Sequence, residues 1–494
     1  MTSSRIVPAA TAAALLAGCT VGPRYAPPTP PSPAADTFAA STPAVASATQ
    51  PPSTWWRLYN SPAIDQLVQE ALTHNNTLLV AVANLAEARG ALDLARAGRY
   101  PSTVLSAGAQ YGVGSESDLA AALTGRGAPS PTPIFSAGLD VSYEIDLFGR
   151  VRRTIEAAKA DVQARRAAED AARISVAGET TRAFVNACAY AQELAVARQS
   201  LGVVGQTLEI TVRESRDGTV SDFDVARARE QVASVQATLP VYEGERRTAL
   251  FQLAVLTGRP PEEISRAADT CKAPPKLARV LPVGDVQALF KRRPDVRQAE
   301  RQLAGDVARI GVVTANLYPA ITIGGSVATA ATTLSGLTSP GNLSYAIGPM
   351  LNWTFPNTLV AHAQIREARA TASASLANFQ ATVLQALQDT EVALTAYANE
   401  LDRNASLTVA RDQSLKAFNL ARVQLQLGRV SYLDLLTAQT DLVAANAQLA
   451  ASDQAVASDQ VTLFKALGGG WEQAPEIQPL PIRDARTGKD ITVR

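Results

Sequence analysis

A stretch in the C-terminal part of the chain, from Asn357 to Leu467, contains no proline and a single glycine, Gly428. Because proline and glycine interrupt helices most strongly, this stretch predicts two helices joined at Gly428. The first helix, from about Thr358 to Leu427, would be about 105 Å long at ~1.5 Å rise per residue. A helix several times longer than the width of an ordinary domain predicts an elongated protein.

This hairpin has a second copy upstream. Residues Gly218–Val225 (GTVSDFDV) align with Gly428–Leu435 (GRVSYLDL) at a constant offset of 210 residues, and Gly258 aligns with Gly468 at the same offset. The tract from Ile134 to Leu239 is also free of proline. An internal repeat favours one elongated body over several separate domains, although the chain has 494 residues.

The composition narrows the classes of function. The net charge is zero, which gives no case for nucleic acid or an acidic partner. Apolar residues make up 47% of the chain but aromatic residues only 5%, and small side chains at this frequency suit closely packed helices. The two histidines, His74 and His362, stand in unrelated contexts without a nucleophile or metal-ligand spacing beside them. We therefore expect no enzyme activity and no cofactor.

The N-terminus has the parts of a secretory signal. Residues 1–18 contain Arg5 near the start, an apolar run from Ala9 to Ala17, and small residues at the end. The tetrapeptide Leu-Ala-Gly-Cys that ends at Cys19 resembles the bacterial lipobox, after which the cysteine is lipidated and becomes the first mature residue. We expect a covalent lipid such as palmitate on Cys19.

A strap of residues 19–60 would lead from this lipid to the body of the protein. Val21–Pro52 is rich in proline, alanine, serine and threonine, which predicts an extended segment. Trp55–Tyr59 is interpreted as a packing anchor for the strap. Thr20, in place of an aspartate, resembles the pattern that sorts lipoproteins to the outer membrane.

The other two cysteines, Cys188 and Cys271, are too few and too scattered to predict a disulfide framework or a zinc site. Cys188 lies in a helical tract. We interpret it as a small buried apolar side chain.

Alternating apolar and polar residues follow two Tyr-Pro pairs, at Tyr100 and Tyr318, where the proline favours an extended residue before it. The alternation predicts strands at about 102–114, 134–146, 320–330 and 343–355. Strands of about ten residues with period two are typical of transmembrane β-strands.

The second of these strands carries three carboxylates on one face, Asp140, Glu144 and Asp146, and only apolar residues on the other. Half-buried soluble sheets also alternate, so the pattern alone does not identify a membrane protein. In an exported chain it favours lipid outside and water inside, with the three acids facing the lumen. Four strands cannot enclose a water-filled lumen, so about three copies or more are required.

Helix lengths predict how each half is built. The long arm Arg150–Arg216 has 67 residues, whereas the return arm Thr219–Thr257 has 39, with Pro240 expected to kink it. A helix of 23 residues precedes each pair of strands, at Thr77–Arg99 and Asp295–Leu317. A 39-residue helix and a 23-residue helix stacked end to end have nearly the length of the long arm. Each half would therefore place one long helix beside two short ones.

The predicted fold is a mixed α+β membrane protein with an internal two-fold repeat. The prolines of the linker and of the C-terminal tail suggest that both pack around the waist of the molecule. The segments are a signal peptide 1–18, a strap 19–60, a first repeat 61–258 with its tip at 217–221, an equatorial linker 259–284, a second repeat 285–468 with its tip at 428–431, and a tail 469–494.

Several motifs together resemble one family. They are Val21-Gly22-Pro23-Arg24-Tyr25 after the lipobox, Arg292-Arg293-Pro294-Asp295 with Ala299-Glu300, the two Tyr-Pro pairs and the two Gly-x-Val-Ser tips. The chain resembles an outer-membrane efflux protein of the TolC/OprM type, in the lipoprotein (NodT-like) branch. This branch serves tripartite pumps of the resistance-nodulation-division (RND) class. The resemblance covers nearly the whole mature chain.

The resemblance implies a homotrimer that forms one tube, with a twelve-stranded β-barrel in the bacterial outer membrane and a long α-helical barrel across the periplasm. The tube would be a passive exit duct for drugs or other small molecules, as in multidrug resistance. Its partners would be a periplasmic membrane-fusion adaptor, an inner-membrane RND pump and outer-membrane lipid.

The resemblance also assigns roles at the hairpin tips. The tips are equally consistent with ordinary helix turns, in which glycine ends one helix and serine caps the next. The residues that would touch the adaptor are Gly218, Thr219, Val220 and Ser221 of the first tip and Gly428, Arg429, Val430 and Ser431 of the second.

A carboxylate ring above the second tip would narrow the entrance. Asp434 falls on one ring position, but the next position is Thr437, so the acidic ring would be weaker or single. Three carboxylates around a narrow axis would attract cations and raise one another's pKa. The other interpretation of Asp434, a first-turn aspartate stabilised by the helix dipole, stays open.

Two alternative functions remain open. The same tube could serve a type I protein exporter or a metal-ion pump, although two methionines give no methionine stripe for metal export. A non-channel lipoprotein that acts as a rigid periplasmic spacer is more distant, because a spacer has no need of four amphipathic strands.

Replacement of Cys19 by alanine is expected to abolish acylation without loss of the fold, because the lipid would be attached only through the cysteine. Metabolic labelling with palmitate measures the acylation of the variant beside the wild type. Label retained on Cys19→Ala would contradict the lipoprotein interpretation.

Overall fold

The computed structural model describes residues 20–29, 37–112, 131–356, 358–484, 486–487 and 489–491. The expected signal peptide, Cys19 and the end of the first expected strand at 113–114 lie outside these ranges. The chain divides into two compact units. The sheet unit comprises Met1–Pro28, Glu87–Gln163 and Glu300–Asn378, and the hairpin unit comprises Thr29–Ala86, Ala164–Ala299 and Phe379–Arg494.

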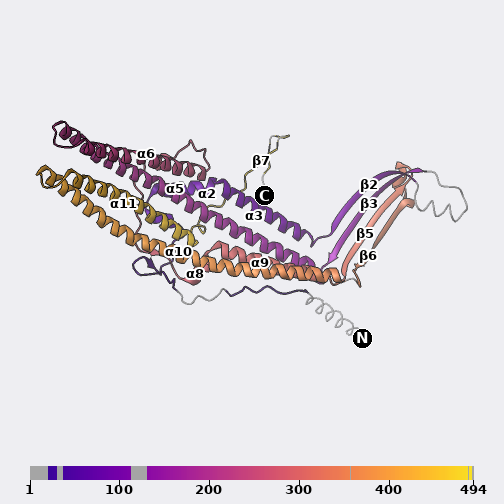
Figure 1. The fold of residues 1–494 in the computed structure, drawn as a ribbon. Coiled ribbons are helices and arrows are strands. Elements are labelled where there is room, and N and C mark those ends of the chain that lie inside the picture. Colours follow the sequence, from indigo (N-terminus) through magenta and orange to yellow (C-terminus); the bar gives the residue numbers. More distant parts are fainter. Residues whose placement is uncertain are drawn as a thin grey trace. The chain divides into compact units, whose positions relative to one another are not determined.

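Four strands of the sheet unit form one antiparallel sheet in the order β2-β3-β5-β6 (Figure 1). All four lie close to the expected positions. The last strand ends at Asn352, before the expected residue 355, because Asn352 pairs with Ala320, the first residue of the neighbouring strand. Beyond this end Trp353 and Phe355 stack on each other, with ring centroids 4.7 Å apart. The bounds are Ser102–Gly112 for β2, Thr132–Ile145 for β3, Ala320–Ala331 for β5 and Leu343–Asn352 for β6, with the short 3-10 turns η2 (Leu334–Thr338) and η3 (Pro340–Asn342) between the last two.

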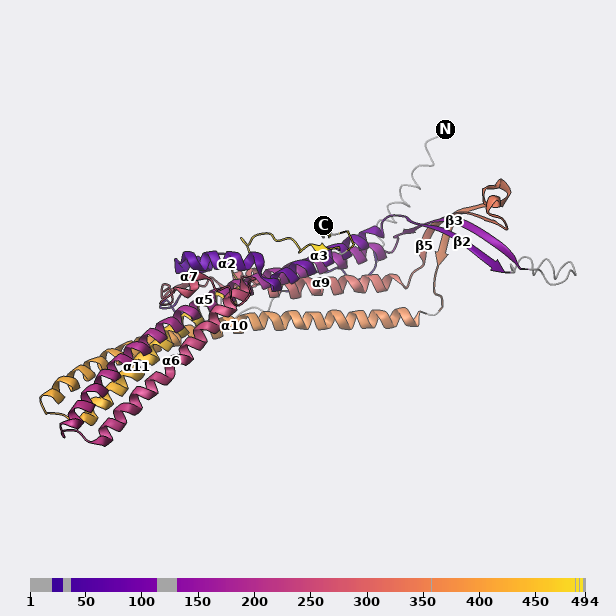
Figure 2. The ribbon, with the colours of Figure 1, turned by 90° about the horizontal axis from the view of Figure 1, so that it is seen from above.

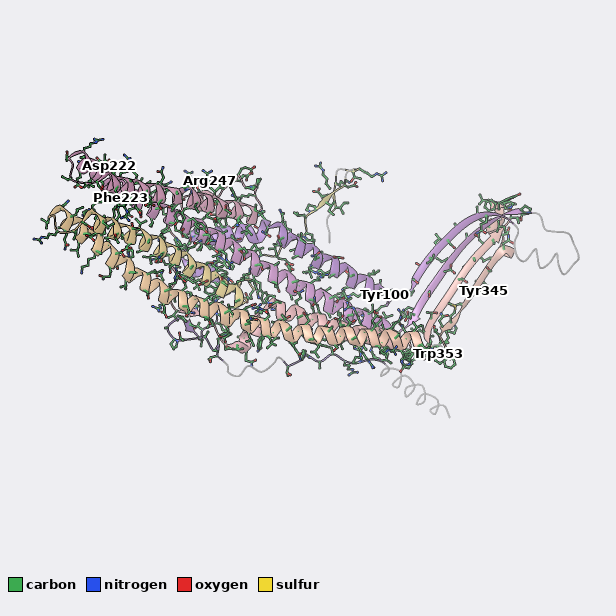
Figure 3. The ribbon with its side chains drawn as sticks, viewed as in Figure 1. Tyr100, Asp222, Phe223, Arg247, Tyr345 and Trp353 are labelled. Carbon is green, nitrogen blue, oxygen red and sulfur yellow. A yellow bond between two sulfur atoms is a disulfide. The ribbon has the colours of Figure 1, made fainter. Side chains whose placement is uncertain are left out.

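The strand register separates apolar and polar side chains onto opposite faces of the sheet. Leu105 of β2, Leu139 of β3, Val327 of β5 and Tyr345 of β6 form one row across it. Their exposed fractions are 81%, 43%, 46% and 81% in that order. Figure 3 shows the position of Tyr345 on β6. Because successive residues point to opposite faces, the next row lies on the other side, and it consists of Ser106, Gly138, Ala328 and Ser344.

Long helices occur where the proline-free tracts predict them. Helix α5 spans Arg150–Arg216, the expected bounds, and α10 spans Leu359–Gln426. The return helices are α6 at Asp222–Leu256 and α11 at Tyr432–Ala466. Two views show each long helix running beside its return helix, α5 with α6 and α10 with α11 (Figure 1 and Figure 2). Helix α6 continues through Pro240.

The shorter helices connect these arms to the strands and the linker. None of the helices in the described ranges combines the length and the apolar character needed to cross a membrane. Helices α3 and α9 both end two residues before the expected boundary, just ahead of the Tyr-Pro pairs. The bounds are Trp55–Tyr59 for the 3-10 helix η1, Pro62–His74 for α2, Asn76–Ala97 for α3, Arg266–Asp269 for α7, Val286–Arg292 for α8 and Pro294–Ala315 for α9.

The core of the hairpin unit forms where the strap, the linker and the tail pack on the helices. Trp55 is fully buried and stacks on Phe464 of α11, with ring centroids 4.9 Å apart. The two-residue strands β1 (Ala46–Ser47) and β4 (Leu281–Pro282) pair in parallel and join the strap to the linker. Ala474 and Ile477 of the tail contact the same core. A second two-residue pair, β7 (Ile482–Arg483) with β8 (Asp490–Ile491), lies in the tail.

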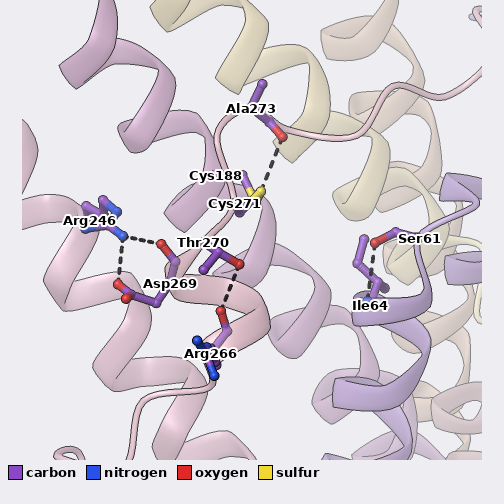
Figure 4. Close-up of a disulfide and its surroundings, with 9 residues drawn as sticks. All are labelled: Ser61, Ile64, Cys188, Arg246, Arg266, Asp269, Thr270, Cys271 and Ala273. Atoms are coloured by element: carbon purple, nitrogen blue, oxygen red, sulfur yellow. Dashed lines mark hydrogen bonds and ion pairs between the residues drawn. A yellow bond between two sulfur atoms is a disulfide. The ribbon is translucent and has the colours of Figure 1, made fainter.

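A disulfide joins Cys188 and Cys271 (Figure 4). Cys188 is buried as expected, but the interpretation that the scattered cysteines predict no disulfide was wrong. Cys188 is fully buried on α5, and Cys271 follows α7 in the linker, 83 residues later. The pairing depends on the linker folding back onto the helices, which sequence spacing does not reveal. Arg246 of α6 holds the same turn of the linker through an ion pair with Asp269 at 2.8 Å. The linker therefore connects α5 to α6 near the base of the first hairpin.

Replacement of Cys188 and Cys271 by serine together is expected to lower the free energy of unfolding of the hairpin unit by about 2–5 kcal/mol, because the crosslink closes a long loop. Chemical denaturation followed by tryptophan fluorescence would measure the change. The reduced and oxidised wild type form the matched pair of controls. Equal denaturation midpoints for all three forms would contradict a stabilising role.

Candidate functional site

The two hairpin tips have the same backbone geometry. Gly218 and Gly428 adopt φ angles of 78° and 67°, a region that only glycine enters without strain. The next residue, Thr219 or Arg429, donates its N–H to a carbonyl five positions back, Glu214 or Gln424, at 2.9 Å in both tips. These bonds satisfy the last carbonyls of α5 and α10 and fix the sharp reversal of the chain.

A capping box starts each return helix. The Ser431 hydroxyl accepts a hydrogen bond from the N–H of Asp434 at 3.2 Å, and the Asp434 carboxylate accepts from the N–H of Ser431 at 2.8 Å. Ser221 and Asp224 form the same reciprocal pair at the start of α6. The sequence Ser-x-x-Asp thus explains why the helices begin at these residues.

The carboxylate of Asp434 is therefore engaged by its own tip. Hydrogen bonds from the hydroxyl and the N–H of Ser431 hold the pKa of Asp434 below its usual range, so the side chain is ionised at neutral pH. Thr437, one turn further along, donates its hydroxyl to the carbonyl of Leu433. Within one chain these contacts agree with the capping interpretation of Asp434, and a gate role stays a prediction.

The two tips differ in the burial of the first residues of their return helices. Tyr432 at the start of α11 is buried, and its hydroxyl is hydrogen-bonded to that of Thr211 on α5. The residue at the equivalent position of the first tip, Asp222, is exposed, and so is Phe223 beside it, at 67% (Figure 3). Arg227 lies over the Phe223 ring at 5.6 Å. The first tip presents an aromatic surface, and the second buries one.

The contact between Tyr432 and Thr211 fastens the second hairpin to the first. Tyr432 belongs to a small apolar cluster with Phe418, Leu435, Leu436 and Leu442, and Val203 of α5 packs against it. The sequence alone did not predict this contact. The available signal was the break in the repeat, in which Tyr432 replaces the polar Asp222 at the offset of 210 residues.

The three acids expected in the lumen occupy different positions in and after β3. Asp140 lies within the strand, opposite Val104 and Ser326. Glu144 is ion-paired with Arg150. Asp146 lies beyond the last strand residue, and its carboxylate accepts hydrogen bonds from the N–H groups of Val151 at 2.9 Å and Arg152 at 2.8 Å. Placing Asp146 in the strand was wrong, because it caps the N-terminus of α5.

The first described residues of the strap are held at the junction of β3 and α5. Val21 donates its N–H to the carbonyl of Phe148 at 3.2 Å, and the buried Arg153 donates to the carbonyls of Val21 and Gly22 at 3.3 and 3.4 Å. A Cβ at Gly22 would lie 2.5 Å from the Cα of Gly311, so only glycine fits. The residues that follow Cys19 therefore have a fixed position in the sheet unit.

No group of three or more His, Cys, Asp or Glu side chains suited to a metal ion occurs within the described ranges. His74 lies at the end of α2, where its Nδ1 is 3.1 Å from the carbonyl of Glu70.

Several known proteins are similar to this chain in sequence and in fold. The model of the family described as outer membrane efflux protein matches residues 67–259 and 286–469. Nodulation protein T of Rhizobium leguminosarum bv. viciae is 29% identical over 463 residues, which are 94% of this chain and 93% of that protein. The probable outer membrane lipoprotein SilC of Salmonella typhimurium is 26% identical over 468 residues, 92% of this chain and 97% of its own.

Solved structures of outer-membrane channels have the same fold as this chain. The outer-membrane channel OprN superposes with a TM-score of 0.83 at 29% identity and covers 92% of this chain and 100% of its own. The open state of the Neisseria gonorrhoeae MtrE outer membrane channel gives a TM-score of 0.78 at 26% identity and covers 92% and 99%. The ranges matched by the family model include both helical hairpins and cover more than half of the chain. The chain therefore belongs to the outer membrane efflux protein family.

Proposed function

We propose that three copies of this chain form a lipid-anchored duct in the outer membrane, the exit channel of a tripartite pump of the RND class. The duct would carry small molecules passively from a periplasmic adaptor and an inner-membrane pump to the exterior. The observation that carries this proposal is the exposed apolar face of the sheet, with the row Leu105, Leu139, Val327 and Tyr345.

The sheet also supports a trimer. Strands β2 and β6 are the outer strands, and no other strand in the described ranges pairs with their free edges. In a bilayer every backbone N–H and C=O group must be paired, so an open sheet edge is not stable there. Three copies with four strands each would join edge to edge into a closed barrel of twelve strands, wide enough for a lumen.

The strap supports lipid anchoring. Arg153 and Phe148 hold residues 21 and 22 close to the start of α5, next to the end of strand β3. A lipid on Cys19 would therefore attach close to the place where the membrane strands meet the helices. This is the position that a membrane anchor requires.

The tips support docking of an adaptor. Each tip is a short turn, and the first exposes Phe223 with Arg227 lying over its ring. Aromatic and arginine side chains are enriched at the centres of protein interfaces. A partner built of helical hairpins would find an aromatic contact on the first tip and the guanidinium of Arg429 on the second.

Small molecules are the proposed cargo. Relatives of this chain in Pseudomonas putida are named for toluene efflux, antibiotic efflux and pyoverdine export. The cargo differs among these relatives while the channel family stays the same, so we propose that the pump selects the compound. A protein exporter and a metal pump remain alternative engines for the same tube. A non-channel spacer is less favoured, because it would not require the exposed apolar face of the sheet.

The apolar face can be tested with two neighbouring residues that point to opposite sides of β2. Leu105→Lys is expected to destabilise the membrane-inserted form by about 2–4 kcal/mol, because a charge would face the lipid. Ser106→Lys is the matched control and is expected to have little effect. The fraction of trimer in outer membranes, measured by gel mobility without heating, is the readout. Equal losses in both variants would contradict the assignment of the faces.

Single-channel conductance in planar bilayers tests the duct and its entrance together. The wild type is expected to show small discrete steps, and the steps should grow in Asp434→Ala, which removes the acidic constriction. Tyr432→Phe keeps the ring in its cluster but removes the bond to Thr211, so the entrance is expected to open more often. Tyr100→Phe, at an exposed tyrosine of the sheet unit, is the control.

The outcomes separate the parts of the proposal. Equal steps in wild type and Asp434→Ala would keep the duct and discard the acidic gate. If well-folded oligomers of every variant gave no steps, the duct itself would be wrong and the spacer would be favoured.

A further inference from the structure

Glu193 of α5 is a buried carboxylate in the hairpin unit that no contact explains. Its side chain belongs to a residue with only 5% of its surface exposed, and its Oε1 has no hydrogen-bond partner among the described residues. None of the ion pairs formed in the described ranges involves Glu193. Burial of an ionised carboxylate without a partner is costly, so such a group is normally protonated or functional.

A small cavity lies beside this carboxylate, between α5, α6 and α11. Its volume is about 50 Å³, enough for a water molecule. Among the described residues, Tyr242 of α6 is the only other titratable group on its walls. The wall from α11 is apolar, formed by Val443 and its neighbours, and no cationic side chain of the described ranges lines the cavity. The carboxylate therefore faces a nearly apolar space without a counter-ion.

These surroundings set the charge of Glu193. Burial raises the pKa of Glu193 to about 7, and no nearby charge contributes. Burial also raises the pKa of Tyr242, and Glu193 adds to this shift, so the tyrosine stays neutral at any physiological pH. Glu193 thus changes its charge close to neutral pH, and it does so at a site where three helices meet.

The α6 wall of the cavity is also where that helix is weakest. Val235, Thr238 and Tyr242 line the cavity on both sides of Pro240. Proline lacks the N–H that would bond the carbonyl four residues back, at Gln236, so one rung of the helix ladder is missing. The hydroxyl of Thr238 donates to the carbonyl of Val235 at 2.8 Å and occupies another backbone group in this segment. A helix bends most readily at such a place.

We propose that Glu193 is a proton-binding site that controls the packing of α6 against α5 and α11, with Pro240 as the hinge. The protonated carboxyl is neutral and tolerates the apolar cavity. The ionised carboxylate requires water, which enters when the tip-side part of α6, Asp222–Leu239, moves outward. This inference concerns the packing within one chain and does not depend on the proposed transport function.

The direction of the pH dependence follows from the raised pKa. When α6 is displaced and Glu193 is hydrated, its pKa returns to about 4.3. The closed packing is therefore most stable below about pH 4.3, loses stability as the pH rises from there to about 7, and changes little at higher pH. Between pH 6 and pH 8 the equilibrium for opening should increase about tenfold.

Hydrogen–deuterium exchange of the full-length protein tests this proposal. The rates at pH 6 and pH 8 are compared after correction for the intrinsic pH dependence of amide exchange. In the wild type, amides of α6 between Asp222 and Leu239 should exchange about tenfold faster at pH 8. Glu193→Gln keeps the shape without the charge and should remove the difference. Glu209→Gln, at an exposed glutamate of the same helix, should behave as the wild type.

Two results would overturn the proposal. One is equal corrected exchange of the wild type at both pH values, and the other is a pH difference that persists in Glu193→Gln. If Glu193→Gln fails to fold, Glu193→Met supplies an uncharged side chain that suits the apolar walls, and its exchange should also be independent of pH. Equal corrected exchange of the wild type at both pH values would overturn the proposal even without a folded variant.

Discussion

The outer edges of β2 and β6 impose the strongest constraint on this protein. Each edge presents backbone N–H and C=O groups that no other strand of the described chain satisfies, and the sheet beside them exposes an apolar face. In water such a sheet would aggregate, and in lipid the edges would be unstable. The proposed trimeric barrel removes both problems at once. The sheet is therefore the part of the chain that the proposed trimer would stabilise most.

The hairpin unit is constrained differently. Long helices with small side chains do not build a thick core, so other contacts must hold the hairpins in place. Its two hairpins share the same glycine reversals and capping boxes but are secured differently. The first is held at its base by the disulfide and by Arg246, and the second is held near its tip by Tyr432. The repeat thus conserves the local geometry of the tips and differs in the long-range contacts around them.

Local patterns in the sequence were enough to place most of the fold. The absence of proline predicted α5 with its observed bounds, and alternation predicted the four strands, because both signals act through neighbouring residues. The pairing of Cys188 with Cys271 depends on the path of the linker, and the partner of Tyr432 depends on the rotation of α5. Asp146 was misplaced because alternation does not mark where a strand ends and a helix cap begins. Glu193 gave no signal, since a glutamate within a helix is usually exposed.

The disulfide makes the two hairpins differ in their covalent connections. The chain from Cys188 to Cys271 is a closed ring, and the first tip lies inside it. A single peptide-bond break at that tip would leave α5 and α6 joined through sulfur. No disulfide of the described chain encloses the second tip, so the same break there would divide the chain into two pieces that only side-chain packing holds together. A nicked molecule would therefore keep its first hairpin as one covalent unit while the second became a complex of two fragments.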